Sequence, residues 1–304
     1  MTIILDAVVD FLILTLRLSI PIILGALAAT IAERSGVICL GVEGMMLIGA
    51  FFGVLGSYLG GPWIGVLLAI VSGAAIGLIY GVFGVLLHGN QTVVGLAVNI
   101  FAGGFTPLLC NIFWGTEGVS ETVATLPNLT IPGIKNIPYV GKLFTEFSPF
   151  LPFTLVLIIV LHTVLYKTKY GLRLRAIGDY PLAVQTQGIN TNLYKLVAMG
   201  LSGIVAALGG AYLSISFSNV FIADMIAGRG FMGVAANIFG GWTPLGSCLA
   251  SLFFAAVHSI RYYLIGTSIS THLVQMIPYV VTLFALVFFG RKSQSPEGLG
   301  QTVE

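Results

Sequence analysis

The sequence predicts an all-α protein: a polytopic transmembrane bundle of about eight to ten helices, with broken, glycine-rich helices among them. Three observations support this fold class. Hydrophobic residues make up 57% of the chain and charged residues only 8%, whereas soluble domains carry about 25% charged residues. Apolar runs of roughly 20 residues, the length that crosses a bilayer, follow one another along the chain. The polar and apolar alternation of a membrane barrel strand is missing.

Windows of about 19 residues place the expected spans in order along the chain. Eight of them lie at 11–31, 37–58, 63–87, 92–113, 149–166, 193–216, 244–264 and 272–289. A shorter, glycine-rich segment lies at 226–241. Backbone groups in lipid must be bonded within the protein, so we expect these spans to be helices. We expect residues 1–304 to form a single transmembrane domain, with loops outside the membrane at 115–148 and 167–192.

Loop charges predict how the chain is oriented. Four basic residues directly follow the fifth predicted span: Lys167, Lys169, Arg173 and Arg175. Positively charged loops remain in the cytoplasm, so loop 167–192 is expected there, together with the C-terminus, which carries Arg291 and Lys292. Loop 115–148 has no positive excess and is expected to be extracellular. Counting spans backwards places the N-terminus outside a multi-pass protein of the bacterial plasma membrane.

Several function classes are excluded by composition. The net charge is +2 and no basic block is interleaved with aromatic residues, which argues against nucleic acid as a partner. The three cysteines and four histidines are scattered without metal-ligand spacing, so we expect no metal site. The sequence contains neither a GxxxxGK[ST] phosphate loop nor an HExxH motif. We therefore expect a chain that is not an enzyme and binds no cofactor itself.

Two glycine-rich stretches, 35–49 and 227–241, stand in corresponding places of the two halves of the chain. Small residues let helix backbones approach closely in lipid, so tight helix packing is one interpretation. The other is that both stretches are helices broken at membrane depth, which transporters place at the substrate path. Their corresponding positions also suggest an internal repeat.

A short helix outside the membrane is predicted at 179–188. Asp179 can cap its first turn, and Pro181 suits that turn because its missing N–H is not needed there. Three residues would form an apolar contact surface, and Gly188 would end the helix. The three are Leu182, Ala183 and Val184. The pattern fits a capped surface turn equally well as a docking element.

Three ordered motifs carry a family resemblance. GLRLRAIGDYPLAVQTQGIN, followed by LVAMGLSGIVAALGGAYLS, resembles the cytoplasmic coupling loop of the permeases of branched-chain amino acid, ribose and nucleoside ABC importers. ERSGVICLGVEGMMLIGAFFG and AGRGFMGVAANIFGGWTPLG are similar to the other two signatures of this superfamily. The resemblance covers roughly residues 20–290. Glu43 and Gly44, where the sugar branch has Asp-Leu-Ser, favour the nucleoside branch.

The resemblance implies a permease subunit of a bacterial ABC importer, for nucleosides. Its implied partners are ABC ATPase subunits that bind ATP and Mg, a second, related but non-identical permease, and an extracellular substrate-binding lipoprotein. ATPase coupling would fall on Arg173, Arg175, Gly178, Asp179, Tyr180, Pro181, Leu182, Ala183 and Gly188. An importer for branched-chain amino acids or sugars is an alternative within this class, and a stand-alone secondary transporter or channel is an alternative outside it.

Polar residues within the predicted spans are candidates for the translocation path, because ionisable groups in lipid usually face the bundle interior. Glu43 and Arg229 each lie in one glycine-rich stretch, and either pair with each other or stabilise irregular backbone. Asn99 and Asn237 either line the path or join helices by hydrogen bonds. Phe231 can stack on a nucleobase or face lipid.

Overall fold

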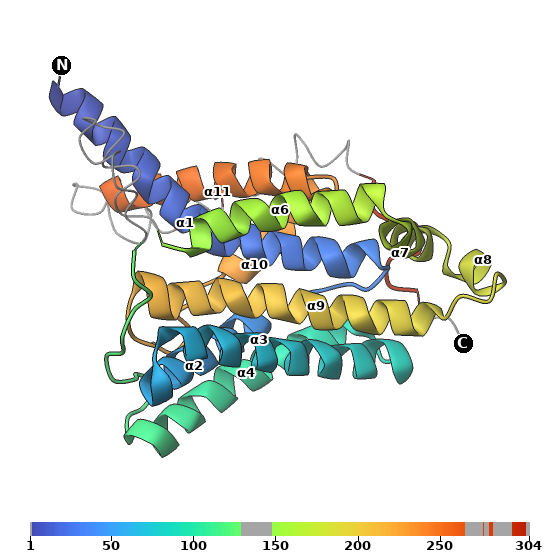
Figure 1. The fold of residues 1–304 in the computed structure, drawn as a ribbon, viewed down its shortest axis with the longest axis horizontal. Coiled ribbons are helices and arrows are strands. Elements are labelled where there is room, and N and C mark those ends of the chain that lie inside the picture. Colours follow the sequence, from blue (N-terminus) through green and yellow to red (C-terminus); the bar gives the residue numbers. More distant parts are fainter. Residues whose placement is uncertain (1, 129–147, 265–275, 277–279, 282–293, 302–304) are drawn as a thin grey trace.

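The fold is that of a helical bundle in a computed structural model, which describes residues 2–128, 148–264, 276, 280, 281 and 294–301 (Figure 1). Its helices before the first gap are α1 (Thr2–Arg34), α2 (Val42–Gly60), α3 (Pro62–Gly81) and α4 (Gln91–Trp114). They are followed by α6 (Phe150–Lys167), α7 (Lys169–Asp179), α8 (Pro181–Gln185), α9 (Thr191–Tyr212), α10 (Arg229–Phe239) and α11 (Pro244–Leu264). Two π-helical turns, η1 (Val82–Leu86) and η2 (Leu213–Phe217), extend α3 and α9.

Six helices in the described part of the chain are long and apolar enough to cross a membrane. They are α1, α2, α3 with η1, α4, α6, and α9 with η2. α11 also has the bounds of the predicted span 244–264. Apart from three single positions, the predicted span 272–289 lies outside the described residues. The prediction of an all-helical, polytopic bundle is therefore confirmed.

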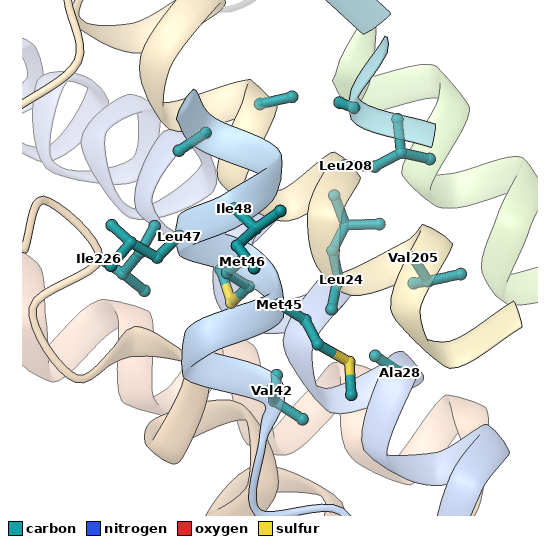
Figure 2. Close-up of a cluster of buried hydrophobic side chains, with 14 of the residues drawn as sticks. Leu24, Ala28, Val42, Met45, Met46, Leu47, Ile48, Val205, Leu208 and Ile226 are labelled. Atoms are coloured by element: carbon teal, nitrogen blue, oxygen red, sulfur yellow. The ribbon is translucent and has the colours of Figure 1, made fainter. Parts of the chain in front are cut away.

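α2 lies at the centre of the bundle, where it packs between α1 and α9 (Figure 2). Met45 and Met46 of α2 lie with Leu24 of α1 and Leu208 of α9 in one buried apolar cluster. A helix that is apolar around its whole circumference is buried on all sides. α2 consequently positions whatever is attached to its first turn.

Close backbone contacts hold α9 against its neighbours, as the small residues predicted. A Cβ added at Gly203 of α9 would lie 2.9 Å from the Cα of Gly77 in α3. A Cβ added at Gly210 of α9 would lie 2.9 Å from the backbone N of Ala50 in α2. Side chains larger than hydrogen would separate these helices, so glycine sets the packing distance here.

Two buried interruptions separate helices in the bundle, one at 35–41 and the other at 218–228. The predicted broken stretches, 35–49 and 227–241, therefore contain the starts of α2 and α10 rather than a break within a helix. α10 has 11 residues, a length of about 16 Å, which is too short to cross a bilayer.

The ends of the bundle differ (Figure 1). α7 and α8 lie at one end, together with the start of α9. At the other end, residues 118–126 run antiparallel to 215–223, with the Val123 N–H donating to the Asn219 carbonyl at 2.9 Å and the Ser120 N–H to the Phe221 carbonyl at 3.0 Å. The predicted loop 115–148 is thus tied to the end of α9 over its described part.

Candidate functional site at the helix junction and the α7–α8 surface

α2 and α10 point away from each other, and their N-termini meet. α2 runs parallel to α9, with Gly53 beside Ala211, and α10 runs parallel to α1, with Asn237 bonded to Thr30. α1 and α9 are antiparallel, because Ser202 bonds Ala28 whereas Tyr212 bonds Arg17. We call the meeting point of the two N-termini the helix junction.

Glu43, in the first turn of α2, joins the two helices at this junction. Its Oε1 accepts the Gly228 N–H and its Oε2 the Gly230 N–H, each at 2.7 Å. The Phe231 N–H also bonds this carboxylate. Helix N-termini carry free N–H groups and a partial positive charge. One carboxylate therefore serves the N-termini of both α2 and α10.

Arg229 stabilises the irregular backbone before α10. Its Nη1 donates to the carbonyls of Met225 and Ile226, at 3.0 and 2.9 Å, while the side chain is almost fully buried. Of the two alternatives for Glu43 and Arg229, stabilisation of irregular backbone is the one that these bonds show.

Asn99 of α4 lies on the α2 side of the junction. Its Oδ1 accepts the Gly44 N–H at 2.8 Å, and its Nδ2 donates to the Leu40 carbonyl at 2.9 Å. Phe231, which is 45% exposed, follows the Glu43 contact on the α10 side. Four predicted path residues, Glu43, Asn99, Arg229 and Phe231, are therefore brought together.

Two further side chains satisfy the 35–41 backbone, and sequence reasoning missed both. The Tyr80 hydroxyl donates to the Ile38 carbonyl, and Gln91 Oε1 accepts the Ile38 N–H, each at 2.8 Å. Unbonded backbone groups at membrane depth cost several kcal/mol. The available signal was the presence of a phenol and an amide at span ends.

Asn237 lies apart from the junction. It is fully buried, and its Nδ2 donates to Glu33 Oε2 at 2.8 Å while its Oδ1 accepts from Thr30 Oγ1 at 2.7 Å. Trp242 Nε1 donates to the same Glu33 oxygen at 2.5 Å. Between polar lining and helix-to-helix bonding, the second describes Asn237, which joins α10 to α1. The role of Glu33 was not predicted.

The predicted helix at 179–188 differs from the observed structure at its start. Helix α7 already occupies 169–179, and the Tyr180 N–H bonds the Ala176 carbonyl at 2.8 Å, so Asp179 ends α7 and does not cap α8. Thr168 caps α7 by accepting the Gly171 N–H at 3.2 Å. Pro181 does occupy the first turn of α8, and Gly188 follows it with a φ of +79°, as the sequence predicted.

The surface of α8 separates into an outward and an inward face. Leu182 is 66% exposed, and Tyr180 and Ala183 are exposed beside it. Pro181 and Val184 are buried, which corrects the prediction that Val184 belongs to the same contact surface. The outward side therefore offers an apolar patch at the end of the bundle.

Arginines and a glycine hold α7 in place. Arg173 Nη1 donates to the Tyr194 hydroxyl of α9 at 3.1 Å. The Arg175 guanidinium lies 4.6 Å from the ring centre of Tyr166 in α6, a cation–π contact. Gly178 packs against the end of α1, where an added Cβ would lie 3.1 Å from the Arg34 carbonyl carbon. α7 thus moves with the helices that it contacts.

Comparisons with known proteins agree with this architecture. Residues 11–286 match the family model described as branched-chain amino acid transport system / permease component. The guanosine ABC transporter permease protein NupQ of Bacillus subtilis is 35% identical over 94% of this chain and 93% of its own. The nucleoside ABC transporter permease protein NupC of Lactococcus lactis is 33% identical, over 93% and 92%.

A more distant relative is the guanosine ABC transporter permease protein NupP of Bacillus subtilis, 25% identical over 78% of this chain and 69% of its own. A solved inward-facing structure of a metal-chelate type ABC transporter has the same fold, with a TM-score of 0.53 and 14% identity over 91% of this chain and 84% of that one. The family match over most of the chain and the close relatives agree, and the chain belongs to the permease-component family of the branched-chain amino acid transport systems, among the ABC transporter permeases.

Proposed function

We propose that this chain is the permease subunit of a bacterial ABC importer that takes up nucleosides. The two relatives of highest identity given above are permeases of guanosine and nucleoside ABC transporters, and they match this chain nearly end to end. Glu43 and Gly44, which favour the nucleoside branch, lie at the helix junction. The substrate class therefore follows from relatives whose sequence similarity includes this site.

The outward face of α8 is the proposed docking point for the ATPase. Leu182 and Ala183 are exposed there, and Gly178 connects α7 to the end of α1. ATP and Mg would be bound by the ATPase, whose closure would push α8 and switch the path between inward-facing and outward-facing states. An extracellular lipoprotein would deliver the substrate. NupP and NupQ, two permeases of one organism, support a second, non-identical permease as a partner.

The proposed path passes the helix junction. Discontinuous helices in transporters direct their N-termini at the substrate site near the membrane midplane. In this chain the N-termini of α2 and α10 meet at Glu43, with Asn99 and Phe231 beside them. The exposed ring of Phe231 offers a surface on which a nucleobase can stack.

The observation that carries this proposal is the exposed apolar patch of α8 in a chain of the ABC permease family. Its test is a photo-crosslinking amino acid at Ala183, with Glu117, exposed at the opposite end, as the matched control. We expect Ala183 to capture the ATPase subunit and Glu117 not to capture it. Failure at Ala183 in an active complex would contradict the coupling role of α8.

Substrate class is tested separately in proteoliposomes that contain the co-purified complex and its lipoprotein. We expect ATP-dependent uptake of radiolabelled guanosine, with competition by other nucleosides and none by leucine or ribose. Competition by leucine or ribose alone would move the chain to another branch of its family. Uptake by the chain without an ATPase would instead indicate a secondary transporter.

A further inference from the structure

The described segment 294–301 lies between three other parts of the chain at the α7 end of the bundle (Figure 1). The Gly298 N–H donates to the Gly178 carbonyl at the end of α7, at 2.9 Å. The Gly300 N–H donates to the Gly36 carbonyl of the 35–41 interruption, also at 2.9 Å. One short segment therefore bonds both the α7–α8 connection and the backbone that leads to α2.

Three glycines make this arrangement possible. A Cβ added at Gly298 would lie 2.8 Å from both the Gly178 carbonyl oxygen and Pro181 Cδ. A Cβ added at Gly36 would lie 3.3 Å from the Cα of Gly178 and from the Gly298 carbonyl oxygen, and Gly36 has a φ of +87°. The three backbones are in direct contact, so displacement of one displaces the others.

Two side chains fasten the segment. Lys195 of α9 is only 1% exposed, and its Nζ donates to the Gln301 carbonyl at 2.8 Å. A buried ammonium group without an acceptor is costly, so this carbonyl is needed where it lies. The Tyr180 hydroxyl bonds the exposed Glu297 carboxylate, which raises the pKa of Tyr180 and keeps the phenol protonated at neutral pH.

From these contacts, we propose that segment 294–301 is a clasp that transmits movement of α7 and α8 to the helix junction. The route runs from Gly178 through Gly298 and Gly300 to Gly36, and from there along 37–41 to the first turn of α2. At that turn Asn99 bonds both Leu40 and Gly44, and Glu43 holds the start of α10. Lys195 is thereby a positioning residue for transport. This inference rests on the proposed function, because it requires an ATPase to move α8.

The test compares Lys195→Met and Gly298→Val with Gln294→Ala, an exposed control in the same segment. Guanosine uptake and ATP hydrolysis are measured in the complete complex. For both clasp variants we expect guanosine carried per ATP to fall roughly tenfold, the effect of losing one hydrogen bond to a charged group, with ATP hydrolysis retained. A purely structural role would lower assembly, hydrolysis and uptake together. That result, or unchanged coupling, would overturn the proposal.

A second measurement needs no substrate. Spin labels at Lys169→Cys and Ser295→Cys, in a Cys248→Ser background because Cys39 and Cys110 are buried, report the distance between α7 and the clasp. We expect one narrow distance with and without trapped ATP, and a broadened one in Lys195→Met. A distance that changes with nucleotide in the otherwise native chain, or stays narrow in Lys195→Met, would overturn the clasp. Loss of guanosine uptake in the unmodified complex with this result intact would contradict only the proposed substrate.

Discussion

At the scale of single residues, the polar side chains buried in this bundle mainly satisfy backbone. Glu43, Tyr80, Gln91 and Asn99 each bond N–H or carbonyl groups that no regular helix satisfies. A buried donor or acceptor left without a partner costs about 1–3 kcal/mol, so each of these side chains is needed for stability. Where their bonds hold the ends of α2 and α10, the same residues also set the shape of the proposed path.

Glu43→Gln is expected to weaken the helix junction. Glutamine offers one acceptor oxygen, and its NH₂ group would face a backbone N–H, so the bond to Gly228 or to Gly230 is lost. We expect destabilisation of about 1–3 kcal/mol, measured as a lower thermal midpoint in detergent. Glu117→Gln, on an exposed loop, is the control. Equal midpoints for both variants would show that the charge at Glu43 is dispensable.

Exchanging the charges at Glu43 and Arg229 separates backbone bonding from ion pairing. The double variant Glu43→Arg, Arg229→Glu should not recover the uptake lost in the single variants, because arginine at position 43 would direct donors at the donors of Gly228 and Gly230. The readout is guanosine uptake by the reconstituted complex. Recovery in the double variant would instead indicate that an ion pair carries the function.

Asn99→Leu should be far more harmful than the same change at Asn111 of the same helix. Asn99 bonds the Leu40 carbonyl and the Gly44 N–H, whereas Asn111 is exposed. Loss of both bonds is expected to cost about 2–5 kcal/mol, seen as a lower thermal midpoint, and Asn111→Leu to leave it unchanged. A small effect at both positions would mean that the 35–41 backbone finds other partners.

At the scale of elements, the sequence predicted helices better than their connections. Lipid demands an apolar window of a fixed length, so the predicted spans 63–87 and 244–264 agree with α3–η1 and α11 to within a residue or so. α7 was missed because it is rich in basic residues and no such window covers it. Asp179 was misplaced because tertiary contacts extend α7 through it.

Long-range contacts at the site could be predicted only in part. Glu43 and Arg229 were selected because charged groups are rare in lipid, yet their partners are backbone groups that a residue pattern does not specify. Asn237 was selected for the same reason and instead joins α10 to α1. The bonds between 294–301 and the two glycines, Gly36 and Gly178, left no signal in a local pattern.

Gly230→Ala tests how closely α10 approaches α2. An added Cβ would lie 2.7 Å from the Glu43 backbone N and Cα, and backbone yields less readily than a flexible side chain. We expect a loss of roughly 1–3 kcal/mol from overpacking, together with impaired uptake. Gly103→Ala is the matched control, because its added Cβ meets nothing within 4 Å. Equal behaviour of the two variants would show that the junction has room to separate.

At the scale of the whole molecule, the two interruptions give the bundle a mechanical centre. α2 and α10 leave the helix junction in opposite directions, α2 along α9 and α10 along α1. The segment 35–41 reaches this centre from the α7 end, and 218–228 reaches it from the end where 118–126 is paired. A movement at either end therefore has a short backbone route to Glu43, which suits a protein that alternates access between two sides.

Orientation in the membrane follows from the charges at these two ends, and cysteine labelling tests it. Lys167, Lys169 and Arg173 lie at the α7 end, whereas Glu117 and Glu121 lie at the other. Basic residues remain on the cytoplasmic side. With an impermeant maleimide and a Cys248→Ser background, we expect Glu117→Cys to react in intact cells and Thr186→Cys only after permeabilisation. The reverse pattern would place α8 outside the cell, where no ATPase could reach it, and coupling through Leu182 and Ala183 would be physically excluded.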